Sequence, residues 1–90
     1  MTKGVPKRRQ GLVYYAMLNK EFANPQIIKI CMDAINFVCN SEYDRRMLYE
    51  FVTTDKTAVA VGQKYFCTER KIQKLFRKYM ARAIESITNV

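Results

Sequence analysis

The segment from 68 to 82 carries the side chains with the most specific chemistry in this sequence. Arg, Lys and Gln donate hydrogen bonds to the edges of guanine and adenine, and Arg and Lys also pair with phosphates. Residues 64 to 82 hold seven bases against one acid, a local charge of +6. This composition predicts affinity for nucleic acid. The candidate contact residues are Glu69, Arg70, Lys71, Gln73, Lys74, Arg77, Lys78 and Arg82.

The sequence outside this segment offers few of the residue combinations that catalysis requires. The 90 residues include no His, so a Ser or Cys nucleophile would lack its usual base. The three cysteines, Cys31, Cys39 and Cys67, form no CxxC pair, and they are expected to be reduced, buried thiols. No paired carboxylates or phosphate-binding glycines are found. We therefore expect no enzyme, no metal and no cofactor.

The positive charge of the chain is concentrated at its two ends. The sequence has 16 Lys+Arg and 8 Asp+Glu, a net charge of +8, yet residues 10 to 63 are close to neutral. The first nine residues contain the bases Lys3, Lys7, Arg8 and Arg9 and no acid. They predict a flexible basic arm over 1–11, either in contact with phosphates or a tail without a role. Residues 12–90 are expected to form one domain.

The elements that position these side chains are expected to be helices. With only 3 Gly and 2 Pro, the chain has too few turn residues for a sandwich or barrel. We predict an all-α, compact bundle of four to five helices that ends in a long C-terminal helix. The predicted helices cover residues 12–23, 25–40, 41–53, 57–65 and 68–87.

The helix at 25–40 is expected to be central, because apolar residues cover most of its surface. Its polar residues recur at steps of three and four, which places them on one narrow stripe. They are Gln26, Lys29, Asp33, Asn36 and Asn40. The wide apolar surface is either buried within the chain or forms a homodimer interface.

The segment 57–82 has the proportions of a helix-turn-helix. Thr57 can cap a short helix, for which a strand through Val59 and Val61 is the competing prediction. After a three-residue turn, Thr68 can cap the long basic helix. In such a unit the second helix enters the DNA major groove by its N-terminal residues.

The sequence TAVAVGQKYFCTERKIQKLF at 57 to 76 resembles the helix-turn-helix of sigma-70 region 4 and of small phage regulators that share it. Thr57, Val61-Gly62, Thr68 and Ile72 occupy the family's capping and packing positions. The resemblance implies base contacts from Glu69, Arg70, Gln73 and Lys74.

Two positions depart from the family pattern. Phe66 stands where the family usually has Gly, which predicts a different turn or a longer first helix. Gly62 replaces the more usual Ala, which lowers helix propensity by up to about 1 kcal/mol.

The function expected from these features is that of a sequence-specific DNA-binding transcriptional regulator of the phage or mobile-element type. Its partner would be double-stranded DNA in the cytoplasm of a bacterial host, at the nucleoid. One alternative is a small helical adaptor that contacts RNA polymerase or oligomerises through the 25–40 helix. RNA binding and a basic helix that merely faces water also stay open. No apolar run approaches the roughly 20 residues that span a bilayer, so no membrane is expected.

Overall fold

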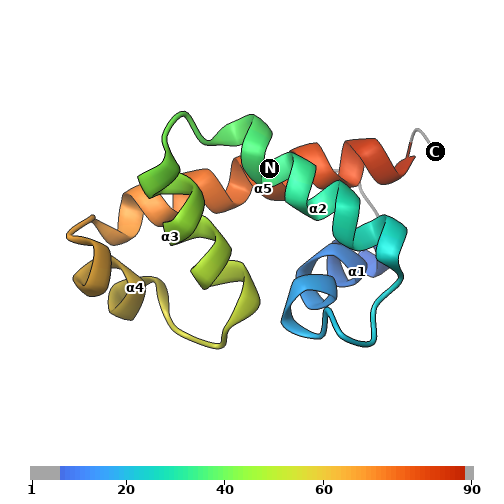
Figure 1. Cartoon of the computed structure of the whole chain (residues 1–90), viewed down its shortest axis with the longest axis horizontal. Coiled ribbons are helices and arrows are strands. Elements are labelled where there is room, and N and C mark those ends of the chain that lie inside the picture. The colour runs from blue at the N-terminus through green and yellow to red at the C-terminus, as the bar shows by residue number, and fades with distance from the viewer. Residues whose placement is uncertain (1–6, 89–90) are drawn as a thin grey trace.

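Five helices follow one another along residues 7–88, and this range contains no strand. The computed structural model describes the backbone of residues 7–88 and the side chains of residues 11–88. Figure 1 shows the arrangement of the helices. They are α1 (Lys7–Leu18), α2 (Pro25–Val38), α3 (Glu42–Thr53), α4 (Ala58–Tyr65) and α5 (Glu69–Thr88). The all-α fold predicted from the sequence is confirmed.

Side-chain caps begin the last four helices. Each capping oxygen accepts a hydrogen bond from a backbone amide in the first turn, which has no partner within the helix. The bonds run to Asn24 from Gln26, to Ser41 from Asp44, to Thr57 from Ala60 and to Thr68 from Lys71. Because these caps are local in sequence, the predicted starts of α2 to α5 agree with the structure to within a residue.

Helix α5 is the central element of the fold. Its 20 residues extend over roughly 30 Å at about 1.5 Å per residue, and the domain measures 36 Å in its longest dimension. In Figure 1, α3 and α4 lie against the first half of α5, and α1 and α2 lie against its second half. Its buried inner residues are Ile72, Leu75, Tyr79, Met80, Ala83 and Ile84.

Helix α1 lies five residues earlier than the predicted helix at 12–23. It runs from Lys7 to Leu18, and its C-terminal end is closed by Asn19, whose amide side chain and backbone both donate to the Tyr15 carbonyl. Lys7, Arg8 and Arg9, predicted as part of a flexible arm, therefore belong to a helix. Lys3 lies outside the described residues.

Helix α2 packs mainly against α5 and also contacts α1 and α3, so the central place predicted for the helix at 25–40 belongs to α5 instead. Cys31, Ala34 and Ile35 are buried between the helices, and all five residues of the polar stripe are exposed. The helix ends at Val38, two residues earlier than predicted. Burial within the chain thus covers the middle of the apolar surface, although Phe37 remains 64% exposed.

The three cysteines are free thiols. Cys31 and Cys39 are buried, as predicted, and burial raises the pKa of both thiols. Cys67 lies in the turn before α5, and it is only partly buried.

Candidate nucleic-acid interface

Helices α4 and α5 form a helix-turn-helix at one end of the molecule. The segment Ala58–Tyr65 is helical, so the competing prediction of a strand there is wrong. Val61 and Ile72 are completely buried where α4 packs on α5. Figure 1 places this unit at the end away from α1, with α3 next to α4 and to the first half of α5.

The turn between the two helices is left-handed, contrary to the prediction from Phe66. Phe66 adopts φ 55° and ψ 42°, a conformation that costs a residue with a side chain roughly 1–2 kcal/mol. In this conformation the amides of Phe66 and Cys67 both donate to the Gly62 carbonyl, the latter at 2.9 Å. The bond from Cys67 is the 6→1 bond of a Schellman motif, and the bond from Phe66 is the 5→1 bond of the simpler left-handed cap, so together they close the end of α4. The chain therefore keeps the tight turn without the usual glycine.

Gly62 is required by the same turn. A Cβ atom at this position would lie 2.6 Å from the Cys67 carbonyl oxygen, which belongs to the backbone and has little room to move. From the sequence, Gly62 is expected only to lower helix propensity. In the structure, the absence of a side chain at Gly62 leaves room for the Cys67 carbonyl and so permits the turn. Gly62 and Phe66 thus act together: one makes space and the other reverses the chain.

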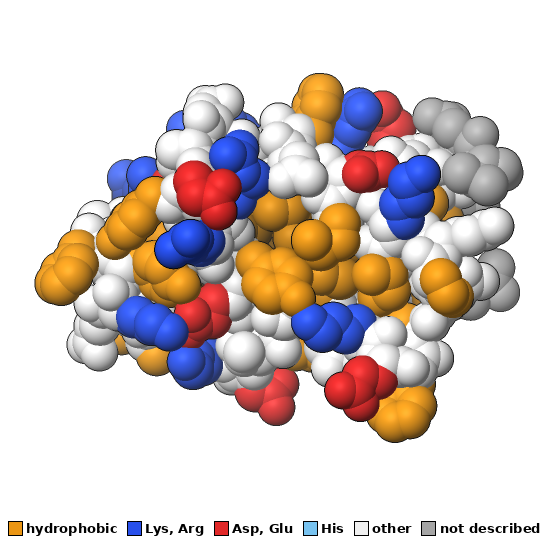
Figure 2. All heavy atoms as spheres, viewed as in Figure 1, with side chains coloured by type: hydrophobic (Ala, Val, Ile, Leu, Met, Phe, Trp, Pro, Cys, Tyr) orange, Lys and Arg blue, Asp and Glu red, His pale blue; other side chains and the backbone are white. Residues whose placement is uncertain are grey.

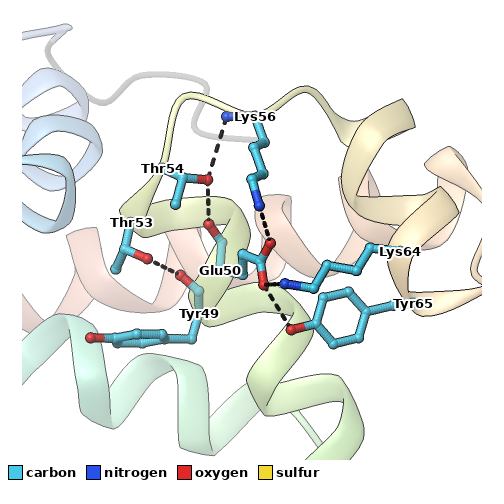
Figure 3. A network of polar contacts seen from close by, with 7 residues as sticks. All are labelled: Tyr49, Glu50, Thr53, Thr54, Lys56, Lys64 and Tyr65. Carbon is cyan, nitrogen blue, oxygen red and sulfur yellow. Dashed lines mark hydrogen bonds and ion pairs between the residues drawn. The ribbon is translucent and has the colours of Figure 1, made fainter.

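Glu50 of α3 holds the helix-turn-helix in place. Figure 3 shows three side chains converging on its carboxylate. Lys56 Nζ lies 2.7 Å away, Lys64 Nζ 2.8 Å, and the Tyr65 hydroxyl donates at 2.9 Å. The hydrogen bonds from Lys56 and Lys64 lower the pKa of this carboxyl to about 2. Glu50 therefore links α3 to the loop between α3 and α4 and to the end of α4.

A second set of contacts joins the start of α3 to the turn and to α5. Asp44 pairs with Lys71 at 3.2 Å, and this hydrogen bond and the negative charge raise the pKa of the lysine. Tyr43 donates to the Tyr65 carbonyl, and the two rings meet edge to face at 5.5 Å. The sequence places Lys71 among the nucleic-acid contacts, whereas the structure directs its ammonium group to α3.

Four basic side chains on the outer face of α5 have no such partner. Arg70, Lys74, Arg77 and Lys78 are exposed, and none forms an ion pair with any other residue from 11 to 88. Lys74 follows Arg70 by four residues, and Arg77 and Lys78 follow Lys74 by three and four, so all four lie on one stripe of the helix. Four unpaired cations on one stripe create a positive surface.

Glu69 and Gln73 lie beside this stripe and contact each other. The Gln73 amide nitrogen donates to the Glu69 carboxylate at 3.1 Å. The bond holds both side chains at the N-terminal end of α5, and it leaves the Gln73 amide oxygen free to accept. This pair supplies acceptors next to the cationic donors of Arg70 and Lys74.

Arg82 is separate from the other candidate contacts. It is twelve residues beyond Arg70, or roughly 18 Å along the helix. Its guanidinium lies 3.9 Å from the centre of the Phe37 ring and 3.8 Å from the Glu85 carboxylate. These contacts tie Arg82 to α2, so the structure does not bring it together with the basic stripe.

The face built from α2, α3 and α4 differs from the outer side of α5. Figure 2 shows this face, with apolar side chains across its middle and acidic and basic side chains mixed around them. Glu42, for example, pairs with both Arg45 and Arg46. Because its charges compensate each other, this face is less suited to a polyanion than the α5 stripe.

The described residues offer little for a metal or a cofactor. No group of three or more Cys, Asp or Glu side chains within residues 11–88 is placed to hold a metal ion. A cavity of about 80 Å³ lies beside the rings of Tyr14, Phe51, Phe76 and Tyr79. No helix between residues 7 and 88 has the length and apolar character needed to cross a bilayer.

Comparison with family models, with curated proteins and with solved structures finds no match for this chain. The resemblance to sigma-70 region 4 therefore stays a prediction from the motif residues alone.

Proposed function

We propose that this chain is a sequence-specific DNA-binding transcriptional regulator that reads the major groove with the helix capped by Thr68. The observation that carries the proposal is the stripe of unpaired cations on α5, directly after a capped helix and a tight turn. A B-DNA major groove about 12 Å wide accepts one helix, and its base edges offer acceptors to Arg and Lys.

Different parts of α5 would make different contacts. Its first two turns carry Glu69, Arg70, Gln73 and Lys74, which would meet base edges, because recognition helices enter the groove by their N-terminal residues. Arg77 and Lys78 lie farther along and would contact phosphates. Lys71 and Arg82 would stabilise the position of α5 and would not contact DNA directly, because Lys71 is paired with α3 and Arg82 lies against α2.

The resemblance to sigma-70 region 4 adds the biological setting to this proposal. It favours a free-standing regulator of a phage or mobile element that acts at the nucleoid in the cytoplasm of a bacterial host. RNA polymerase and a second copy of the chain are the protein partners that such a regulator would use.

An electrophoretic shift assay tests the proposal. DNA fragments selected from a random pool by the native chain serve as the probe. Replacing Arg70 and Lys74 together with Ala should abolish specific binding and leave the helical circular dichroism intact. Replacing Lys20 and Lys29 with Ala is the matched control, because it removes the same charge from the other half of the molecule. Equal binding by both double variants would refute the proposed recognition face.

A protein-interaction module is the second candidate function, favoured by an apolar groove at the other end of the molecule. The groove has a volume of about 350 Å³ and lies between α1 and α2, beside Leu12, Tyr15, Phe22 and Ile27. The adaptor predicted from the sequence would use the 25–40 helix, and this groove includes the start of that helix. Salt separates the two functions: DNA affinity falls with a log-log slope of about −0.9 per neutralised phosphate, whereas apolar association changes little.

A further inference from the structure

The phenyl side chain of Phe66 does not help the fold, for two reasons. Its side chain is 93% exposed, so the ring gains almost nothing from burial. Its backbone is left-handed, a conformation that is an outlier for a bulky residue and is open to glycine without strain. Glycine at this position would satisfy the turn better than phenylalanine does. The ring therefore has to be explained by something outside the folded chain.

Phe22 shows that exposure alone is not unusual. This residue is 88% exposed in the segment between α1 and α2, and its backbone has an ordinary negative φ. Single exposed apolar side chains are common on protein surfaces. Among the described non-glycine residues, only Phe66 has a positive φ. Backbone strain retained at one exposed residue is characteristic of functional sites.

The position of Phe66 is fixed from both sides. Tyr65, the residue before it, is bonded to Glu50 through its hydroxyl and to Tyr43 through its carbonyl. Cys67, the residue after it, is bonded to Gly62. The ring thus projects from a rigid turn, three residues before the first residue of the basic helix that follows Thr68.

We propose that Phe66 is a specificity-determining residue that contacts the C5-methyl group of a thymine in the major groove. The inference rests on the proposed function of α5. Base edges in the major groove present hydrogen-bonding groups and one apolar group, the thymine methyl. An exposed phenyl ring has no hydrogen bonds to offer, so the methyl is the feature of the groove that it can recognise.

The spacing fits a site within a few base pairs of those read by Arg70. Arg70 follows Phe66 by four positions, and base pairs follow one another at about 3.4 Å along the duplex. Arg70 would hydrogen-bond to a guanine, and Phe66 would distinguish thymine from cytosine at a neighbouring position. Because the turn already fixes the backbone at Phe66, such a contact restricts only the rotation of the side chain.

The test combines a protein change with a DNA change. In a binding site selected from random DNA, each thymine is replaced in turn by deoxyuridine, which differs only by the missing methyl. One of these replacements should weaken binding of the native chain about fourfold, the effect of losing one buried methyl group. Phe66→Ala should weaken binding to the thymine site by a similar factor, and it should bind the thymine and deoxyuridine sites equally.

Two further variants secure the interpretation. Phe66→Leu keeps an apolar side chain and should retain part of the preference for thymine. Phe22→Ala removes an equally exposed ring from the other end of the molecule and should leave both affinities unchanged. Alanine at 66 meets the same backbone requirement as phenylalanine, so circular dichroism and the melting temperature should stay close to those of the native chain.

The possible failures are distinct. If Phe66→Ala binds the selected DNA as the native chain does, and still prefers thymine, the role of Phe66 is refuted while the role of Arg70 and Lys74 stands. If the variant weakens binding to thymine and deoxyuridine sites equally without abolishing the preference, the ring contacts something other than the methyl. If the native chain selects no DNA at all, both proposals fail.

Discussion

The two ends of the molecule are held together by different forces. At the helix-turn-helix end, ion pairs of Glu50 and Asp44 connect α3 to the loop, to α4 and to α5. At the other end, α1 and α2 pack on α5 through apolar residues such as Met17, and no ion pair is found within either helix among residues 11–88. The comparison teaches that the end proposed to bind DNA is positioned by polar contacts, whereas the other end depends on burial.

The largest expected effect is at the apolar end. Met17 is 1% exposed, and Met17→Ala removes a side chain from the core between α1 and the other helices. We expect it to lower the free energy of unfolding by about 3 kcal/mol. Urea denaturation measures this loss, which should be nearly the same at pH 7 and pH 4. A loss that depended strongly on pH would contradict the contrast between the two ends.

Acid should weaken the polar end first. The pKa of Glu50 is about 2 in the folded chain and near 4.3 when unfolded. A lowered pKa stabilises the fold fully above pH 4.3, and this contribution is lost as the pH falls toward 2. We expect ionised Glu50 to contribute about 2 kcal/mol to the free energy of unfolding, a value that allows for solvent screening of the half-exposed Lys56 and Lys64.

Glu50→Gln should remove that dependence, as measured by denaturation at a series of pH values. Glu42→Gln is the matched control on the same helix, because Glu42 is 67% exposed and its ion pairs are on the surface. It should change stability by less than about 0.5 kcal/mol. Equal pH profiles for the two variants would show that Glu50 is not the main acid-sensitive contact.

Gly62→Ala should destabilise the turn. The clash with the Cys67 carbonyl is expected to cost about 2 kcal/mol, and the better helix propensity of alanine offsets up to about 1 kcal/mol of this. The net loss of about 1 kcal/mol is measurable by thermal melting. Gly11→Ala is the control, because a Cβ there meets no atom of the described residues within 4 Å. That variant should be neutral or slightly stabilising.

The smallest expected effect has the opposite sign. Phe66→Gly relieves the left-handed conformation and gives up almost no buried surface, so we expect a gain of about 0.5–1 kcal/mol. A rise in melting temperature checks this. A fall would mean that the exposed ring contributes to the fold and would weaken the case for its role in DNA recognition.

Sequence reasoning succeeds in this molecule where the determining interactions are local. The caps at Ser41, Thr57 and Thr68 act on amides three residues away, so residue types and spacing are sufficient to predict the helix starts. The amphipathic pattern of α5 likewise predicts its buried face. Helix α1 is misplaced because its weakly amphipathic sequence does not define where it begins or ends.

The parts that sequence reasoning misses depend on contacts between distant residues. Glu50 is an ordinary acidic residue in the sequence, and nothing local indicates that Lys64, fourteen positions later, lies against it. The left-handed Phe66 is unexpected because intrinsic preference argues against it, and the surrounding contacts override that preference. In the sequence the Glu50 cluster is visible only as an acid followed by Lys56 and Lys64, with Asp55 directly before Lys56, a pattern that many surfaces also show.

Helix α5 contributes one face to the core and presents its basic face to solvent. This arrangement limits how far the helix can move to fit a partner. Its inner side chains are packed against all four other helices along its length. Tilting α5 would open the core at both ends of the molecule at once. At the proposed DNA site, any mismatch in shape would therefore fall on the DNA, and sequences that bend or twist easily would be favoured even at base pairs that no side chain touches.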